Sequence, residues 1–195
     1  MNKNLLISIK SITDLPKQQE EQLFHITKDE SLNKGDIFIR EGQIPRKFAF
    51  VNYGLFRYYY IDQKGNESTK GFSPENTFLI SYTAMIQNRI SYFTIEALEN
   101  ANISVIDYIK WKKLYEEHIC WRNFLVSALE KAFEFKETRE REFLLFDAET
   151  RYKLFLQRFP GLELRVKQHI IASYLGITPV ALSRIRKKMG LVNIS

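Results

Sequence analysis

The sequence predicts an α+β chain in three parts. These are an N-terminal antiparallel β-roll (a double-stranded β-helix) over residues 1–110, a long helix over 111–146 and a helix-turn-helix over 147–195. Three observations lead to this prediction. Short apolar runs alternate with glycine turns in the first part, the second part contains neither glycine nor proline, and one glycine separates two short helical patterns near the end.

The first part opens with a short helical stretch, residues 18–26, and then becomes rich in strand-forming residues. The strand-like runs include residues 37–39, 48–51, 55–61, 94–98 and 103–106. Glycine, proline, asparagine and aspartate separate these runs at short intervals. Many short strands with regular turns are typical of an antiparallel roll or barrel.

The second part carries an apolar seam at spacings of three, four and three residues, formed by Leu125, Ala128, Ala132 and Phe135. This is the spacing of a coiled coil. Its continuation lands on Arg139 and Glu142, so the seam weakens toward the C-terminal end. Two interpretations remain, a dimer interface or a helix that covers the roll. We favour the dimer interface, because a helix this long exceeds what one small roll can cover.

The third part begins at Asp147, which can cap a helix over residues 148–159 that Pro160 and Gly161 end. A second helix then runs to Leu175. Gly176 supplies the positive φ that a tight turn between helices needs.

The last helix, residues 179–189, starts with favourable capping chemistry, because the Thr178 hydroxyl can cap it and Pro179 stands at its first position. One face of this helix is apolar, with Ala181, Leu182, Ile185 and Met189. The other face is polar and cationic, as a helix in a DNA major groove requires. The candidate DNA contacts are Thr178, Pro179, Val180, Ser183, Arg184, Arg186, Lys187 and Lys188. An ordinary amphipathic helix with solvated cations is the alternative.

The distribution of charge favours nucleic acid as the partner. Residues 148–195 contain nine Lys and Arg against two acids, whereas the whole chain has 29 against 23. All of the net positive charge therefore lies in the last quarter of the chain. A basic module on a neutral body is the pattern expected of nucleic-acid contact.

The composition also excludes several classes of protein. The single cysteine, Cys120, excludes an intramolecular disulfide and a thiolate zinc or iron–sulfur site, and no metal site is expected. No apolar run is long enough for a membrane span, and the N-terminus has no signal-peptide pattern, so we expect a cytoplasmic protein without membrane contact. We also find no catalytic motif and therefore expect no enzymatic activity.

The order of these parts resembles the catabolite activator and fumarate/nitrate regulator (Crp/Fnr) family. The resemblance covers nearly the whole chain. Its most specific pieces are the helix-turn-helix, from residues 171–178 through 182–185, and a glycine ladder like that of a cyclic-nucleotide-binding roll. That ladder comprises residues 32–36, Glu41-Gly42, Gly54, and Asp62 with Gly65.

The resemblance implies a homodimeric transcription regulator that binds double-stranded DNA at a pseudo-palindrome and acts with RNA polymerase. Arg184 occupies the position of the family's base-reading arginine. Pro179 and Val180 stand where the catabolite activator has an arginine and a glutamate. We therefore expect a different target sequence.

The effector pocket departs from the family pattern. The family pairs a Gly-Glu at a short helix with a later Arg-Ser, whereas this chain has Pro74-Glu75 and then Arg89-Ile90-Ser91. The one-residue offset reverses the face of a strand that an arginine occupies. The candidate pocket residues are Glu75, Arg89, Ser91 and Lys136. We expect no cyclic AMP binding of the usual kind and identify no cofactor, so an unknown small-molecule effector and a constitutive DNA binder both stay open.

An alternative from another functional class is a small-molecule sensor module whose helix-turn-helix contacts a protein instead of DNA. Neutralising Arg184 and Lys187 separates the two, because only a DNA reader would lose operator binding.

Overall fold

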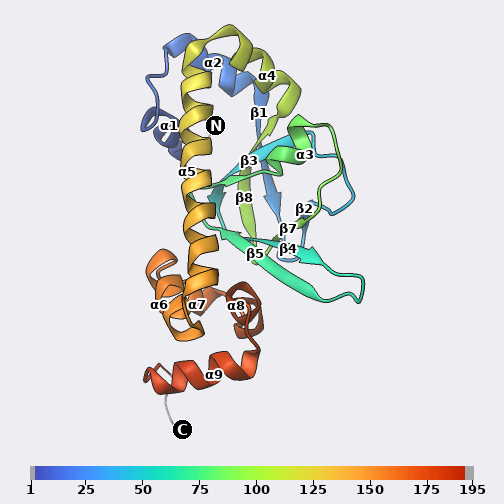
Figure 1. Cartoon of the computed structure of the whole chain (residues 1–195). Helices are drawn as coiled ribbons and strands as arrows, with labels where there is room; N and C mark the ends of the chain where they lie inside the picture. Colours follow the sequence, from blue (N-terminus) through green and yellow to red (C-terminus); the bar gives the residue numbers. More distant parts are fainter. Residues whose placement is uncertain (1–2, 192–195) are drawn as a thin grey trace. The chain divides into compact units, whose positions relative to one another are not determined.

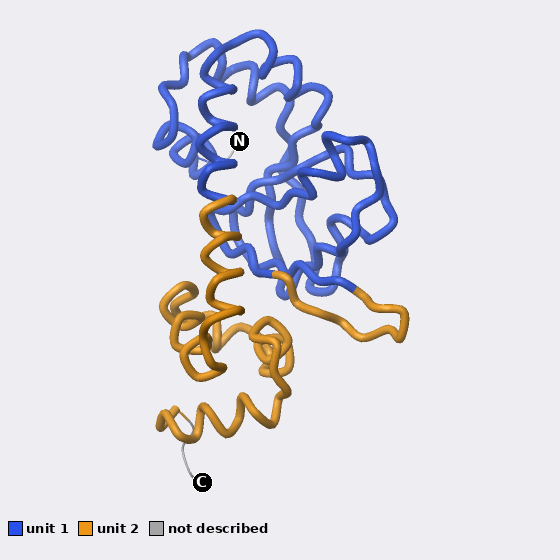
Figure 2. The backbone as a smooth tube through the Cα atoms, viewed as in Figure 1, with its two compact units in different colours: residues 1–60, 71–132 blue, residues 61–70, 133–195 orange. Residues whose placement is uncertain are grey.

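The computed structural model describes residues 3–191 of the chain. Figure 1 shows the order of its helices and strands. The chain forms two compact units, which are coloured separately in Figure 2. Unit 1 comprises residues 1–60 and 71–132, and unit 2 comprises residues 61–70 and 133–195. A ten-residue piece of the β-rich part, 61–70, therefore clusters with the C-terminal helices.

Within residues 3–191, eight strands form two antiparallel sheets of four, with orders β1-β8-β3-β6 and β2-β7-β4-β5. The antiparallel roll expected from the sequence is confirmed. The strands are β1 (Thr27–Leu32), β2 (Ile37–Ile39), β3 (Lys47–Tyr53), β4 (Phe56–Ile61), β5 (Glu67–Ser73), β6 (Phe78–Leu79), β7 (Thr94–Ala97) and β8 (Ala101–Asp107). Strands β1 and β5 lack a run of apolar residues, which is why the sequence pattern did not indicate them.

Strand β3 is buried on both faces, because the two faces serve different cores. Ala49 and Val51 pack between the sheets, in a cluster with Phe56, Ile95 and Ile103. The alternate residues of the same strand, Phe48 and Phe50, pack against the helices of unit 1. This arrangement follows from the two-residue period of a strand. It also explains why β3 reads as a continuous apolar run.

Gly54 makes the turn between β3 and β4 possible. Its φ is +104°, and a Cβ added there would lie 2.5 Å from the Ala101 Cβ. We expect Gly54→Ala to lower the free energy of unfolding by about 2–4 kcal/mol, the sum of an unfavourable φ and a rigid overlap. Urea unfolding measures this, with Gly65→Ala as the control, because Gly65 also has a positive φ (+82°) but no neighbour within 4 Å. Equal losses in the two variants would contradict the prediction.

The helices of unit 1 cover the outer face of β3. They are α1 (Lys3–Lys10), α2 (Lys17–Ile26), α3 (Tyr82–Ile86), α4 (Tyr108–Glu117) and the first half of α5 (Ile119–Leu145). Trp121 is fully buried among them. Its indole N–H donates to the Gln19 side-chain oxygen at 2.6 Å, so both buried polar groups are satisfied.

The helix expected over 111–146 is divided in two by His118. This residue is extended, with φ −136° and ψ 136°. Its ring Nδ1 accepts the Cys120 N–H at 3.2 Å, as a capping side chain does at the start of a helix. The Arg122 guanidinium donates back to the Tyr115 and Glu116 carbonyls at the end of α4. These local polar contacts replace the backbone bonds lost at the break, and no glycine or proline is needed.

Unit 2 contains the second half of α5 and four further helices. They are α6 (Ala148–Arg158), α7 (Leu162–Arg165), α8 (Gln168–Leu175) and α9 (Pro179–Lys188). The Asp147 side chain accepts the Thr150 N–H at 2.8 Å, which confirms the predicted cap of α6. Within residues 3–191, no helix is long and apolar enough to cross a membrane.

Candidate nucleic-acid interface

The turn between α8 and α9 has the predicted geometry. Gly176 is left-handed, with φ 67° and ψ 35°, and its N–H bonds back to the last turn of α8. The Thr178 hydroxyl accepts the Ala181 N–H at 3.2 Å, and Pro179 occupies the first position of α9. A Cβ on Gly176 would lie 2.8 Å from the Phe143 ring, so the turn also needs glycine to fit against α5.

The apolar face of α9 holds the helix on the rest of unit 2. Leu182 is fully buried, and Ala181, Ile185 and Met189 are partly buried. Beneath them lies an aromatic core in which the Phe155 ring contacts the Tyr174 ring at 5.6 Å between centroids. The division of α9 into an inner apolar face and an outer polar face is confirmed.

The outer face of α9 is open to solvent. Val180 is 61% exposed, and Thr178, Pro179, Ser183, Arg184 and Lys187 are exposed as well. Arg184 and Lys187 are one turn apart, so their cationic groups stand on the same side of the helix. The α9 helix therefore presents two cations, a hydroxyl and an apolar side chain on one free surface. These are the groups that a helix in a major groove uses on base edges and phosphates.

Two of the candidate DNA contacts already have roles inside unit 2. Lys188 donates to a Glu149 carboxylate oxygen at 2.6 Å, and Lys153 binds the other oxygen of that group at 2.9 Å. These hydrogen bonds lower the pKa of Glu149 and raise that of Lys188. Arg186 is partly buried. The structure thus separates the exposed cations Arg184 and Lys187 from Lys188, which is paired with Glu149, and from Arg186, which is partly buried.

An ion pair joins α5 to α6 within unit 2. Glu142 is 7% exposed and accepts from Arg158 Nη2 at 2.5 Å. Arg158 also donates to the Tyr174 hydroxyl at 3.4 Å. The predicted seam on α5 weakens at Arg139 and Glu142 because these positions bind other helices of unit 2. Sequence reasoning missed their role, and the only signal was the interruption of the apolar stripe.

The four seam residues predicted on α5 lie in different surroundings. Leu125 is partly buried against the core of unit 1 and Ala128 is partly buried. Ala132 is exposed, and Phe135 is 41% exposed with the Arg158 guanidinium over its ring. A second stripe with the same spacing of three and four lies one residue further on, at Val126, Leu129 and Phe133. These side chains are 54%, 37% and 64% exposed.

The candidate effector residues of unit 1 lie in different surroundings. Glu75 accepts the Gly54 N–H at 3.1 Å in the turn before β6. Arg89 is exposed, whereas Ser91 is fully buried. The Ser91 hydroxyl shares a hydrogen bond with the Ser81 hydroxyl at 3.0 Å and donates to the Phe93 carbonyl at 2.8 Å. The fourth candidate, Lys136, belongs to unit 2 and is exposed.

Tyr58 brings a phenol into the interior of the roll beside the start of α3. Its hydroxyl accepts the Ile80 N–H at 3.2 Å and donates to the Phe78 carbonyl at 3.2 Å. Burial raises the pKa of Tyr58, so the phenol stays neutral and keeps its proton for the carbonyl. The amide that precedes α3 is therefore already hydrogen-bonded within the protein.

Residues 29–118 match a known family, the cyclic nucleotide-binding domain. No curated protein sequence matches the chain. Among solved structures, FixK2 from Bradyrhizobium japonicum superposes with a TM-score of 0.75 at 16% identity, over 87% of this chain and 89% of FixK2.

Two further structures agree with this match. CLP from Xanthomonas campestris, a global regulator responsive to c-di-GMP, has a TM-score of 0.73 at 13% identity, covering 90% of this chain and 92% of CLP. A putative transcriptional regulator of the Crp/Fnr family from Eubacterium rectale has a TM-score of 0.74 at 19% identity, covering 93% and 88%. The part of this chain that matches the cyclic nucleotide-binding domain thus lies within a fold similar to that of these regulators, and the expected resemblance to the Crp/Fnr family is confirmed.

The polar groups of the candidate effector region are either exposed or hydrogen-bonded within unit 1. A cyclic phosphate needs a cation and free hydrogen-bond donors. Here the Arg89 side chain is exposed, the Ser91 hydroxyl is engaged with two internal partners, and the Ile80 amide binds the Tyr58 phenol. The polar groups beside α3 are consequently used to hold the domain together.

Replacing Tyr58 by phenylalanine tests this internal network. We expect Tyr58→Phe to lower the free energy of unfolding by about 1–3 kcal/mol, because the Ile80 N–H then loses its bond to the phenol. Urea unfolding gives the value, and Tyr53→Phe is the matched control, since Tyr53 is 61% exposed. The prediction is wrong if both variants unfold at the same urea concentration.

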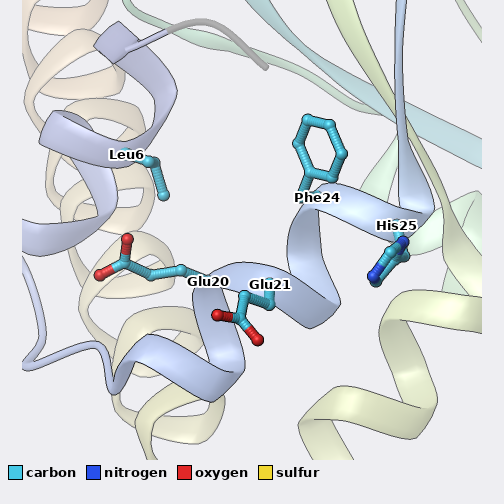
Figure 3. Close-up of a pocket in the computed structure, with 5 residues that line it drawn as sticks. All are labelled: Leu6, Glu20, Glu21, Phe24 and His25. Carbon is cyan, nitrogen blue, oxygen red and sulfur yellow. The ribbon is translucent and has the colours of Figure 1, made fainter.

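A small surface hollow between α1 and α2 is shown in Figure 3. It has a volume of about 240 Å³ and is lined by Leu6, Glu20, Glu21, Phe24 and His25. This is below the usual size of a ligand site. Among residues 3–191, no cluster of three or more histidine, cysteine, aspartate and glutamate side chains could hold a metal ion.

Proposed function

We propose that this protein is a homodimeric, sequence-specific DNA-binding regulator of transcription, without catalytic activity, that acts in the cytoplasm with RNA polymerase as a further partner. The observation that carries the proposal is the outer face of α9, where Arg184 and Lys187 stand exposed beside Ser183 and Val180. The concentration of positive charge in residues 148–195 supports it independently.

Each side chain on this face has a role that follows from its chemistry. Arg184 lies near the middle of α9 and can donate two hydrogen bonds to one guanine edge. Val180 and Ser183 can contact neighbouring bases through a methyl group and a hydroxyl. Lys187 is the candidate phosphate contact, and Thr178 and Pro179 bring the start of α9 close to the DNA backbone. Arg186 and Lys188 add positive charge, while Lys188 keeps its bond to Glu149.

The exposed apolar stripe on α5 supports the proposed dimerisation. Val126, Leu129 and Phe133 recur at the spacing of a coiled coil and are too exposed to serve the monomer's core. Pairing this stripe across a two-fold axis would bury them. Two α9 helices could then enter successive major grooves of a pseudo-palindromic operator, about 34 Å apart.

We propose that DNA binding does not require cyclic AMP, since the groups that would hold its phosphate are already hydrogen-bonded within the domain. A different small-molecule effector is compatible with the fold. CLP, which has a similar fold, is a regulator responsive to c-di-GMP.

Selection of operators from a random duplex library, followed by fluorescence anisotropy, tests the proposed function. We expect tight binding to the selected duplex, a steep loss of affinity between low and moderate salt, and no change when cyclic AMP is added. Enhancement by cyclic AMP would overturn the effector proposal alone. Failure to select any duplex would overturn DNA recognition and favour the alternative, a helix-turn-helix that binds protein.

A further inference from the structure

The segment Ile61–Lys70 belongs to the same compact unit as α8 and α9 (Figure 2). Its tip is closed by its own bonds, with the Asp62 carboxylate accepting the N–H groups of Lys64 and Asn66, both at 2.8 Å. The residues that follow the tip, Glu67–Lys70, are the part that contacts α5 and α8. Nothing in the order of the sequence places them there.

Ser173 on α8 binds this segment in two directions. Its hydroxyl oxygen accepts the Thr69 N–H at 2.9 Å, and the same hydroxyl donates to the Glu67 carbonyl at 3.2 Å. One side chain thus serves a donor and an acceptor of the strand backbone, as a neighbouring strand would. Thr69 is only 5% exposed, so the bond from its N–H to Ser173 lies away from bulk water, where its loss costs the most.

Arg139 on α5 completes the connection. Its Nη1 donates to the Lys70 carbonyl at 2.7 Å and its Nη2 donates to the Tyr174 carbonyl at 2.9 Å. The guanidinium also lies over the Tyr174 ring, 3.7 Å from its centroid. The planar fork of arginine suits this arrangement, because a single group reaches two carbonyls and an aromatic face at once. A lysine could not make all three contacts.

We propose that Arg139 and Ser173 form a latch, which binds the backbone of Glu67–Lys70 and thereby positions α9, the proposed DNA-reading helix (the reader). The latch holds α8, and α8 holds α9 through the Gly176 turn. Because the outer face of α9 is exposed while the latch is closed, the latch does not block the reader. It limits the orientations of α8 relative to α5. The inference rests on the proposed function, and it assigns positioning roles to residues outside the recognition helix.

The physical consequence is a gain in preorganisation. A dimer that must place two helices in successive grooves loses affinity when either reader is free to tilt, because that freedom is given up on binding. We expect Arg139→Ala and Ser173→Ala each to weaken operator binding by about tenfold. Arg139→Lys keeps the charge but not the fork, so we expect it to resemble Arg139→Ala more than the wild type.

The dependence on salt separates positioning from direct contact. A cation that binds a phosphate contributes about one unit per reader to the slope of log K against log salt. Arg139 is turned toward protein carbonyls, so we expect its removal to lower affinity at every salt concentration with no change in slope. Arg141→Ala, which removes an exposed cation from the same turn of α5, is the matched control and should leave the affinity unchanged.

A second measurement tests the hydrogen bonds of the latch in the absence of DNA. Hydrogen exchange of the Thr69 amide in the full-length protein should be slow in the wild type and in Arg141→Ala, and faster in Ser173→Ala and Arg139→Ala. Unchanged affinity in both latch variants, or a slope reduced as for a phosphate contact in Arg139→Ala, would overturn the latch. A wild type that selects no duplex would instead overturn the proposed function, and the positioning role with it.

Discussion

Replacing both Arg184 and Lys187 by alanine is expected to abolish measurable operator recognition. Each contact of this kind contributes about 1–3 kcal/mol to binding, and the dimer loses every contact twice. The affinity for the selected duplex should therefore fall by roughly a thousandfold or more. The slope of log K against log salt should also become shallower, because fewer phosphates are neutralised.

Anisotropy titrations at several salt concentrations measure both effects. The matched control is the replacement of Lys110 and Lys113 by alanine, which removes two exposed cations from α4 and leaves α9 intact. This control should bind the operator like the wild type. If it loses as much affinity as the Arg184 and Lys187 variant, then total charge governs binding and the assignment to α9 is wrong.

The second large effect is expected from a charge in the dimer interface. Phe133→Glu places a carboxylate in the exposed stripe of α5, where it would be buried by the partner helix. The loss of a Phe side chain costs about 1.5–3 kcal/mol on each side of a symmetric interface. The dimer should therefore dissociate at least roughly a hundredfold more readily. A monomer also presents only one reader, so operator affinity should fall with it.

Sedimentation equilibrium gives the association constant, and circular dichroism establishes that the monomer remains folded. Phe135→Glu is the informative comparison, because Phe135 belongs to the stripe with Leu125 and lies beneath the Arg158 guanidinium. It should associate nearly as well as the wild type. The opposite result, a monomeric Phe135→Glu protein with a dimeric Phe133→Glu protein, would assign the interface to the stripe of Leu125, Ala128, Ala132 and Phe135.

The helix-turn-helix formed by α8 and α9 could be predicted in detail from the sequence, because its geometry is local. The Thr178 cap, the first-turn proline and the left-handed Gly176 depend on residues three or four positions apart. The inner and outer faces of α9 follow from the helical period. The roll was predictable as a class from its glycine turns, although β1 and β5 were not, since neither contains an apolar run.

The effector region could be predicted only as a departure from a pattern. The offset of Arg89 and Ser91 is visible in the sequence, but the engagement of the Ser91 hydroxyl by Ser81 is not. The bond between the Tyr58 phenol and the Ile80 amide spans 22 residues. From composition alone, Tyr58 is one of several aromatic residues on a strand.

The sequence by itself determined the order of the parts and the local geometry of the helix-turn-helix, because both depend on residues close together in the chain. It also determined the concentration of positive charge in residues 148–195, because that is a matter of composition. Tertiary structure alone gave the surroundings of the two stripes of α5. Both stripes have coiled-coil spacing, and Leu125 is partly buried against the core of unit 1 whereas its neighbour Val126 is 54% exposed. It also decided that Arg139 binds the Lys70 carbonyl, 69 residues away. Such a contact depends on how the chain closes on itself, and no local pattern records that.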